Sequence, residues 1–177
     1  MRFLRAALAA RFFIQGCFMS TAFLCGNLSE YAIDTLGTQL QEAVKKTIEK
    51  YNIDKVFLVR KNDFDYRFYV LSVMSHIENV EFVEITDKNK TDIEYYEIMN
   101  KGVSFKEIAP FEKEINNKCF YRTLYDYAIE NSDYMITFYD FDDDISAVIE
   151  ERAEAKGLKV INMKDYFSKT LFGYKLK

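Results

Sequence analysis

The sequence has few of the residues that force turns, ligate metals or crosslink a chain. Its 177 residues include one proline, six glycines, one histidine (His76) and no tryptophan. The three cysteines, Cys17, Cys25 and Cys119, form no CxxC pair. A structural zinc site needs about four cysteine or histidine ligands, so the sequence argues against structural zinc; it predicts no cofactor. A sparse, odd set of thiols is typical of a reducing cytoplasm, which is the location we expect.

Positive charge is also scarce. The chain has 24 lysines and arginines against 28 aspartates and glutamates, which gives a net charge of -4. Proteins that bind nucleic acid or anionic membranes in general carry a basic surface. The composition therefore argues against general nucleic-acid binding and against binding to a membrane.

Long hydrophobic runs are absent as well. The apolar stretch within residues 1–18 is interrupted by Arg11 and is too short to span a bilayer. We interpret residues 1–18 as an extension outside the fold, with Met19 as a candidate start, and residues 19–177 as a single domain. A signal peptide and an amphipathic membrane-surface segment are the alternatives for this stretch.

The chain does contain enough apolar material for a packed core, with 49% hydrophobic and 16% aromatic residues. Short apolar runs typical of buried strands alternate with segments whose apolar residues recur every four positions, as in amphipathic helices. The expected strands are Thr21–Cys25, Lys55–Val59, Val80–Ile85, Tyr134–Phe138 and Leu158–Ile161, and the expected helices are 36–48, 64–75, 119–131, 145–156 and a short closing helix at 164–172. This alternation predicts an α/β fold, a Rossmann-like three-layer α/β/α sandwich with a mainly parallel sheet of about five strands.

Four aspartates, Asp140, Asp142, Asp143 and Asp144, follow the fourth expected strand. The carboxyl ends of parallel strands are where open α/β sheets bind ligands. Carboxylates there repel a phosphate by about 1–4 kcal/mol at contact distance, which disfavours a simple phosphate pocket. Three interpretations stay open: the aspartates cap the next helix, Asp140, Asp142 and Asp143 hold Mg²⁺ or Ca²⁺, or the run binds a cationic ligand or partner.

Three short stretches in a fixed order carry a family resemblance. Phe64–Asp65 is followed by Leu71–Val73, residues 129–134 read IENSDY, and residues 155–162 read AKGLKVIN. These stretches are similar to the SLOG superfamily of Rossmann-like domains, above all to its uncharacterised YpsA-like branch, which is met in bacteria and their mobile elements. More distant relatives are DNA-processing protein A and the lonely-guy phosphoribohydrolases. The resemblance covers about residues 20–163 and implies a nucleotide-binding type of fold.

The chain departs from this family where the family holds phosphate. Such domains place glycines before the FD pair, where this chain has Arg60–Asp63, and a Gly-Gly pair where it has Asp144–Ile145. An Arg-Asn pair of the family falls at Leu124–Tyr125, and its first-turn histidine falls at Asn27. Backbone N–H groups beside glycines approach a phosphate closely, and side chains block that approach. The resemblance therefore implies a retained scaffold whose phosphate-holding segment has been replaced.

The candidate ligand-binding residues follow the expected strands. Gly26 occupies the family's first glycine turn, and Asp65 occupies a ligand-contact position by resemblance. Arg60 and Lys61 offer side-chain charge to an anionic group, with a solvated basic turn as the alternative. The full candidate set is Gly26, Asn27, Arg60, Lys61, Phe64, Asp65, Tyr139 and Asp144.

Glu150 and Glu151 raise an enzymatic alternative. Phosphoribohydrolases of the superfamily have a glutamate a few residues into the corresponding helix, where a carboxylate can attack or stabilise an oxocarbenium-like sugar centre. The same two residues belong to a charged EER run that is typical of a solvated helix face. We therefore expect a non-catalytic domain that binds a nucleotide-derived small molecule or a protein partner. Cleavage of an N-glycosidic bond by Glu150 or Glu151 and self-assembly into a homo-oligomer are the alternatives.

Overall fold

The structure is a computed structural model that describes residues 20–27, 30–59, 68–69, 72, 76–77, 79–86, 106–111, 115, 117–138, 144–170 and 173–176. Residues 1–18, interpreted above as an extension, lie outside this set. The helix expected at 64–75 is described only at Phe68, Tyr69 and Ser72, and all three are helical.

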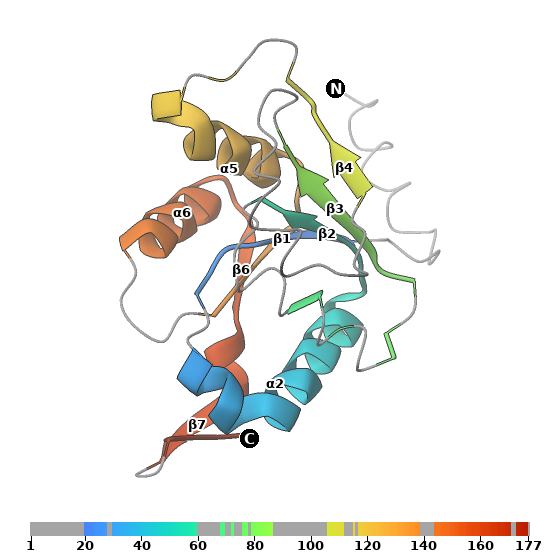
Figure 1. Ribbon diagram of the computed structural model, residues 1–177, viewed down its shortest axis with the longest axis vertical. Helices are drawn as coiled ribbons and strands as arrows, with labels where there is room; N and C mark the ends of the chain where they lie inside the picture. The colour runs from blue at the N-terminus through green and yellow to red at the C-terminus, as the bar shows by residue number, and fades with distance from the viewer. Residues whose placement is uncertain are drawn as a thin grey trace, which may run out of the picture.

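One parallel sheet of six strands forms the centre of the described chain (Figure 1). In chain order the strands are β1 (Ser20–Leu24), β2 (Ile53–Leu58), β3 (Glu81–Ile85), β4 (Lys106–Ile108), β5 (Tyr134–Thr137) and β6 (Lys159–Asn162). Their order across the sheet is β4-β3-β2-β1-β5-β6, and every neighbouring pair is parallel. Strand β4 was not expected, because three residues that begin with the charged pair Lys106 and Glu107 show no apolar run.

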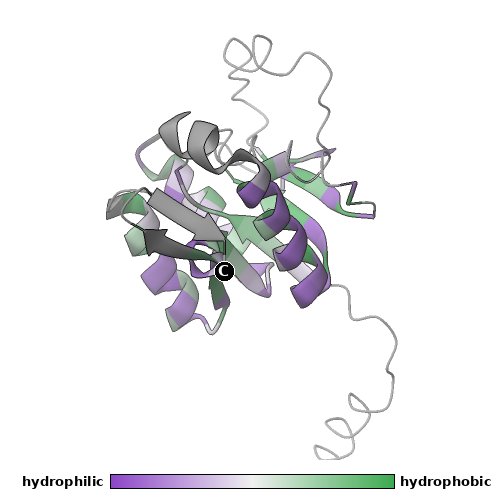
Figure 2. Cartoon of the chain, turned by 90° about the horizontal axis from the view of Figure 1, so that it is seen from below, coloured by the Kyte–Doolittle hydropathy of each residue, from purple (hydrophilic) through white to green (hydrophobic). Residues whose placement is uncertain are grey.

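Helices cover both faces of this sheet. Helix α2 (Glu30–Tyr51) packs on one face, and α5 (Phe120–Glu130) and α6 (Asp144–Ala155) pack on the other (Figure 1). Successive residues of β1 alternate between the two cores, since Leu24 lies on the α2 side and Phe23 on the side of α5 and α6. In Figure 2 mainly green strands lie between largely purple helices. The expected three-layer α/β/α sandwich is confirmed.

The observed bounds of α2 and α6 can be compared with those expected from the sequence. Helix α2 begins at Glu30, about a turn and a half before the expected start near residue 36. Ala32 extends the four-residue spacing of Leu36 and Leu40 by one turn, and this small residue is a weak signal of a buried stripe. Helix α6 ends at Ala155, and Gly157 closes it as expected, with a φ of 85° in the left-handed region that glycine favours.

The closing helix expected at 164–172 is wrong. A short 3-10 turn, η2 (Met163–Tyr166), is followed by an antiparallel hairpin of β7 (Phe167–Thr170) and β8 (Gly173–Leu176). The Asn162 side chain accepts a bond from the Lys164 N–H and so caps the turn. Phe167 is buried in the α2-side core, where its ring meets that of Phe138 edge to face at 6.2 Å. Contacts with distant parts of the chain, which local spacing does not encode, therefore fix this segment.

Candidate binding site at the switch point of the sheet

The strand order reverses between β1 and β5, in the middle of the sheet. The chain leaves β1 for α2 on one face, and it leaves β5 for α6 on the other. In open α/β sheets ligands bind at such a switch point, at the carboxyl ends of the strands. The Cys25 N–H donates to the Ile136 carbonyl over 3.1 Å, and the Asn27 N–H donates to the Phe138 carbonyl over 2.9 Å. The backbone of the switch point is therefore fixed as far as Asn27 and Phe138.

Three small polar side chains are buried at this point, and we call Cys25, Thr137 and Ser146 the switch-point floor. Each of them is at most 2% exposed. The β1–β5 pairing, continued by one residue, makes Cys25 the neighbour of Thr137. Thr137 lies on the same side of β5 as Met135, which belongs to the core beneath α5 and α6. Both strands therefore present a polar group to the helix layer where they end.

The switch-point floor contains one satisfied contact and one unsatisfied hydroxyl. The Cys25 thiol donates to the Ser146 hydroxyl over 3.8 Å. The Thr137 Oγ1 has no hydrogen-bond partner in the described part of the chain. A buried hydroxyl without a partner costs about 1–3 kcal/mol by mutational measures. A ligand atom that bonds the Thr137 Oγ1 removes this cost, so this hydroxyl is the group of the switch-point floor that has a hydrogen bond left to offer.

Two predicted ligand-binding residues lie beside this floor. Gly26 is buried and Asn27 is exposed, and both directly follow β1. Their positions match the first glycine turn that the family resemblance implies. Gly26 and Asn27 are therefore brought together with the carboxyl end of β5, as a binding role requires.

Helix α6 holds the two predicted catalytic residues. Its buried face is formed by Ser146, Ile149 and Ala153. Glu150 is half-buried, and Glu151 is exposed to solvent. Asp144, a predicted ligand-binding residue, is the first residue of the helix. The residue of α6 that reaches the switch-point floor is thus Ser146, through its contact with Cys25.

Most of the other predicted site residues lie outside the described residues. These are the ligand-binding candidates Arg60, Lys61, Phe64, Asp65 and Tyr139 and the metal candidates Asp140, Asp142 and Asp143. Within the described ranges, no three histidine, cysteine, aspartate or glutamate side chains come together as metal ligands would. No helix in the part of the chain that the structure describes has both the length and the apolar character that crossing a membrane requires.

The sequence interpretation missed the switch-point floor as a unit. The sequence marks Cys25 as a thiol and as the end of the first expected strand, and it singles out neither Thr137 nor Ser146. A threonine that closes the strand YMIT was the available signal, because β5 is otherwise apolar or aromatic. Nothing in the sequence marks Ser146, which gains its place from the packing of α6 on β1.

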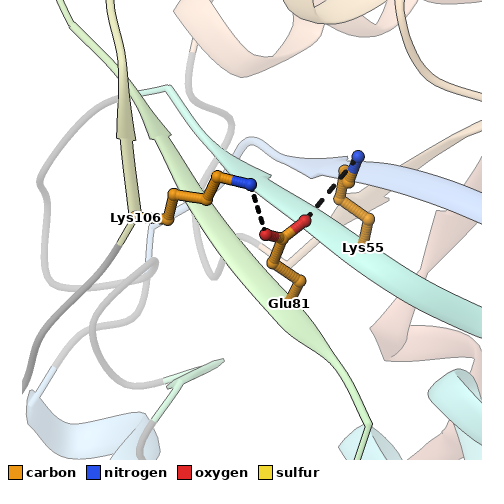
Figure 3. Close-up of polar contacts among 3 residues, drawn as sticks. All are labelled: Lys55, Glu81 and Lys106. Atoms are coloured by element: carbon orange, nitrogen blue, oxygen red, sulfur yellow. Dashed lines mark hydrogen bonds and ion pairs between the residues drawn. The ribbon is translucent and has the colours of Figure 1, made fainter.

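The amino ends of the strands carry a separate set of charges (Figure 3). Glu81, the first residue of β3, lies between Lys106 at 2.7 Å and Lys55 at 3.7 Å. The hydrogen bond from Lys106, together with the charges of both lysines, holds the pKa of Glu81 below its ordinary value despite partial desolvation. All three side chains are at least 40% exposed. These three charged residues lie at the opposite end of the strands from the switch point, where their ion pairs link β2, β3 and β4.

A groove with a volume of about 360 Å³ lies between α5 and α6. Its lining residues are Asp126, Ile129, Glu130, Arg152, Ala155 and Lys156. Arg152 forms an ion pair with Asp126 across the groove, so its central charges are matched within the chain. The groove follows the carboxyl-terminal halves of both helices and is distinct from the switch point.

Comparison with protein-family models finds no match for the chain, and comparison with curated proteins finds none either.

Proposed function

We propose that the chain is a non-catalytic, SLOG-like domain that binds a nucleotide-related ligand at the switch point of its sheet. The observation that carries this proposal is the switch-point floor, because it places an unpartnered buried hydroxyl where open α/β sheets take their ligands. Gly26 and Asn27 border the same point. A buried hydroxyl without a partner destabilises a hydrophobic core, whereas in a binding site the same hydroxyl can form a hydrogen bond with the ligand.

The charge of the segment before α6 limits which chemical group of the ligand the protein can recognise. Four aspartates lie between residues 140 and 144, and Asp144–Ile145 stand where the resembling family has its Gly-Gly pair. Carboxylates disfavour a phosphate held by main-chain N–H groups. The proposal is therefore a ligand recognised by its sugar or base rather than by a phosphate clasped at residues 140–146.

The placement of α6 supports binding rather than catalysis. Glu151 is exposed, and the face of α6 that meets the switch-point floor presents Ser146. A carboxylate that attacks a sugar carbon has to lie within bonding reach of that atom. The exposed position of Glu151 therefore favours the solvated helix face over the enzymatic alternative for that residue.

Thermal unfolding with a panel of nucleosides, nucleotides and nucleotide-sugars tests the proposal. At about 100 times Kd, a ligand that binds only the folded state stabilises this size of domain by about 2.7 kcal/mol, a rise in Tm of about 5–10 °C. We expect at least one compound to produce such a rise. Silence across the whole panel overturns the proposal.

A matched pair of variants locates the site. Asn27→Ala changes an exposed residue at the switch point, and Asn131→Ala changes an exposed residue at the amino ends of the strands, where its side chain donates to the Tyr127 carbonyl. We expect Asn27→Ala to weaken the ligand-induced rise in Tm and Asn131→Ala to preserve it. The reverse result places the ligand elsewhere.

A further inference from the structure

We infer that the ligand carries a planar aromatic ring, which packs between Tyr121 of α5 and Ile145 of α6. This inference rests on the proposed function, and it names the part of the ligand that the protein recognises. Tyr121 and Ile145, with Val148, are the large hydrophobic residues that the described chain exposes, at 48%, 54% and 53%. All three belong to the two helices that cover one face of the sheet.

Tyr121 continues the buried face of α5 past the end of the sheet. Tyr125, four residues later, is 3% exposed, and its ring meets that of Phe23 edge to face at 6.4 Å. Residues four apart share one face of a helix, so Tyr121 lies above the same side of the sheet. Its ring also contacts that of Phe120, at 5.3 Å, which helps to orient it.

The height of Tyr121 along the sheet follows from the direction of α5. The helix ends just before β5, so it runs against the strands, and its amino end lies toward their carboxyl ends. Four helical residues rise about 6 Å, and two strand residues span about 6.6 Å. Since Tyr125 lies beside Phe23, Tyr121 lies about level with Cys25, at the switch-point floor.

Ile145 reaches the same level from α6. It precedes Ser146, which contacts Cys25, and it lies one turn before Ile149 of the core. Helix α6 ends just before β6, as α5 ends just before β5, so both helices run against the strands and parallel to each other. An exposed ring on α5 and an exposed aliphatic side chain on α6 therefore lie at the level of the Cys25–Ser146 contact.

The switch-point floor indicates that the ligand also carries a hydrogen-bonding group. Thr137 is fully buried, and its Oγ1 has no partner in the described part of the chain. A ring with a polar edge satisfies both surroundings, with its faces against Tyr121 and Ile145 and its edge toward Thr137. Nucleobases have this chemistry, since every base has a π-face and a hydrogen-bonding edge.

Isothermal titration calorimetry with adenosine, guanosine, cytidine and uridine, and with ribose 5-phosphate as a ring-free probe, tests the inference. We expect a nucleoside to bind the wild-type chain and Tyr121→Ala to weaken that binding by about 5- to 100-fold, because base stacking is lost. Tyr121→Phe keeps the ring and stays within about 2-fold of wild type. Glu154→Ala, which shortens an exposed residue nine positions beyond Ile145 and near the other end of α6, is the control and leaves the affinity unchanged.

The outcomes separate the inference from the proposed function. If Tyr121→Ala has the same Tm as wild type and binds the nucleoside with equal affinity, the proposed ring contact is wrong, while the proposed site at the switch point is not contradicted. Binding of ribose 5-phosphate as tight as that of every nucleoside also overturns it. If none of these compounds nor any compound of the thermal panel binds the wild-type chain, the proposed function fails and the ring contact fails with it.

Discussion

The Cys25 thiol donates to the Ser146 hydroxyl over 3.8 Å, and this contact joins the end of β1 to the first turn of α6. Both side chains are at most 2% exposed. Because β1 and β5 are paired here, the contact holds the amino end of α6 above the switch point, next to Thr137. The contact therefore ties the amino end of α6 to the sheet, while Ile149 and Ala153 pack the helix on the core.

Replacing Thr137 by valine is expected to stabilise the protein and weaken ligand binding. The substitution keeps the shape of the side chain and removes a buried hydroxyl that has no partner, so the free energy of unfolding rises by about 1 kcal/mol. Urea unfolding measures this change, and calorimetry with the bound nucleoside measures the loss of affinity.

Thr47→Val is the matched control for that experiment. Thr47 is equally buried, but its hydroxyl donates to the Ala43 carbonyl over 2.8 Å. Removing a satisfied hydrogen bond lowers the free energy of unfolding by about 0.5–1.5 kcal/mol. An equal loss of stability in Thr47→Val and Thr137→Val contradicts the assignment of Thr137 as an unsatisfied group.

Gly157→Ala is expected to lower the free energy of unfolding by about 1–2 kcal/mol through backbone strain alone. Gly157 has a φ of 85°, and a Cβ built on it meets no atom within 4 Å. The Gly157 N–H donates to the Glu154 carbonyl and the Leu158 N–H donates to the Ala153 carbonyl, which is a Schellman ending of α6. Thermal unfolding of Gly157→Asn provides the comparison, because asparagine tolerates positive φ and loses less stability. A larger loss in Gly157→Asn than in Gly157→Ala contradicts the strain argument.

Glu81 is expected to stabilise the fold in a pH-dependent way. Its pKa lies below the ordinary value of 4.5, chiefly because Lys106 donates a hydrogen bond to it. A carboxyl whose folded pKa is depressed stabilises the protein above its unfolded pKa and loses that effect as the pH falls through the folded pKa. Glu81→Gln is therefore less stable than wild type at neutral pH, and the difference disappears in acid.

Urea unfolding at neutral pH and well below pH 4.5 measures this difference. Glu154→Gln, which makes the same substitution at an exposed position of α6, is the control. Because Glu81 is 41% exposed, added salt also reduces its effect. A Glu81→Gln difference that persists unchanged in acid contradicts the ion-pair explanation.

Much of the fold could be predicted from the sequence because its strands are buried on both faces. Runs such as Val56–Val59 and Tyr134–Ile136 are continuous and apolar or aromatic, and such runs are typical of parallel sheets covered by helices. Strand β4 and the β7–β8 hairpin were missed because pairing with β3 and packing of Phe167 on Phe138 hold them in place. These are contacts between distant segments, and no local period reports them.

The candidate binding site could be predicted only in part. The expected first strand put Gly26 and Asn27 directly after its carboxyl end, and the structure places them there, with the Asn27 N–H bonded to the Phe138 carbonyl; their ligand-binding role stays a prediction. The role of Thr137 depends on its strand register beside Cys25, and that of Tyr121 depends on the direction of α5. Both relations depend on how distant segments pack, which local sequence does not encode. Thr137 and Tyr121 therefore could not be identified as site residues from the sequence.

Glu150→Gln and Glu151→Gln are expected to leave ligand affinity unchanged. Glu151 is exposed on α6, and the helix contributes Ser146, which accepts from the Cys25 thiol, to the switch-point floor. A binding domain also releases no base from a nucleoside or a nucleoside monophosphate, which chromatography of the reaction mixture measures. Base release by the wild-type chain that disappears in either glutamine variant contradicts the non-catalytic role. It assigns that carboxylate to cleavage of the N-glycosidic bond, because glutamine keeps the size of the side chain but cannot attack or stabilise the sugar centre as a carboxylate does.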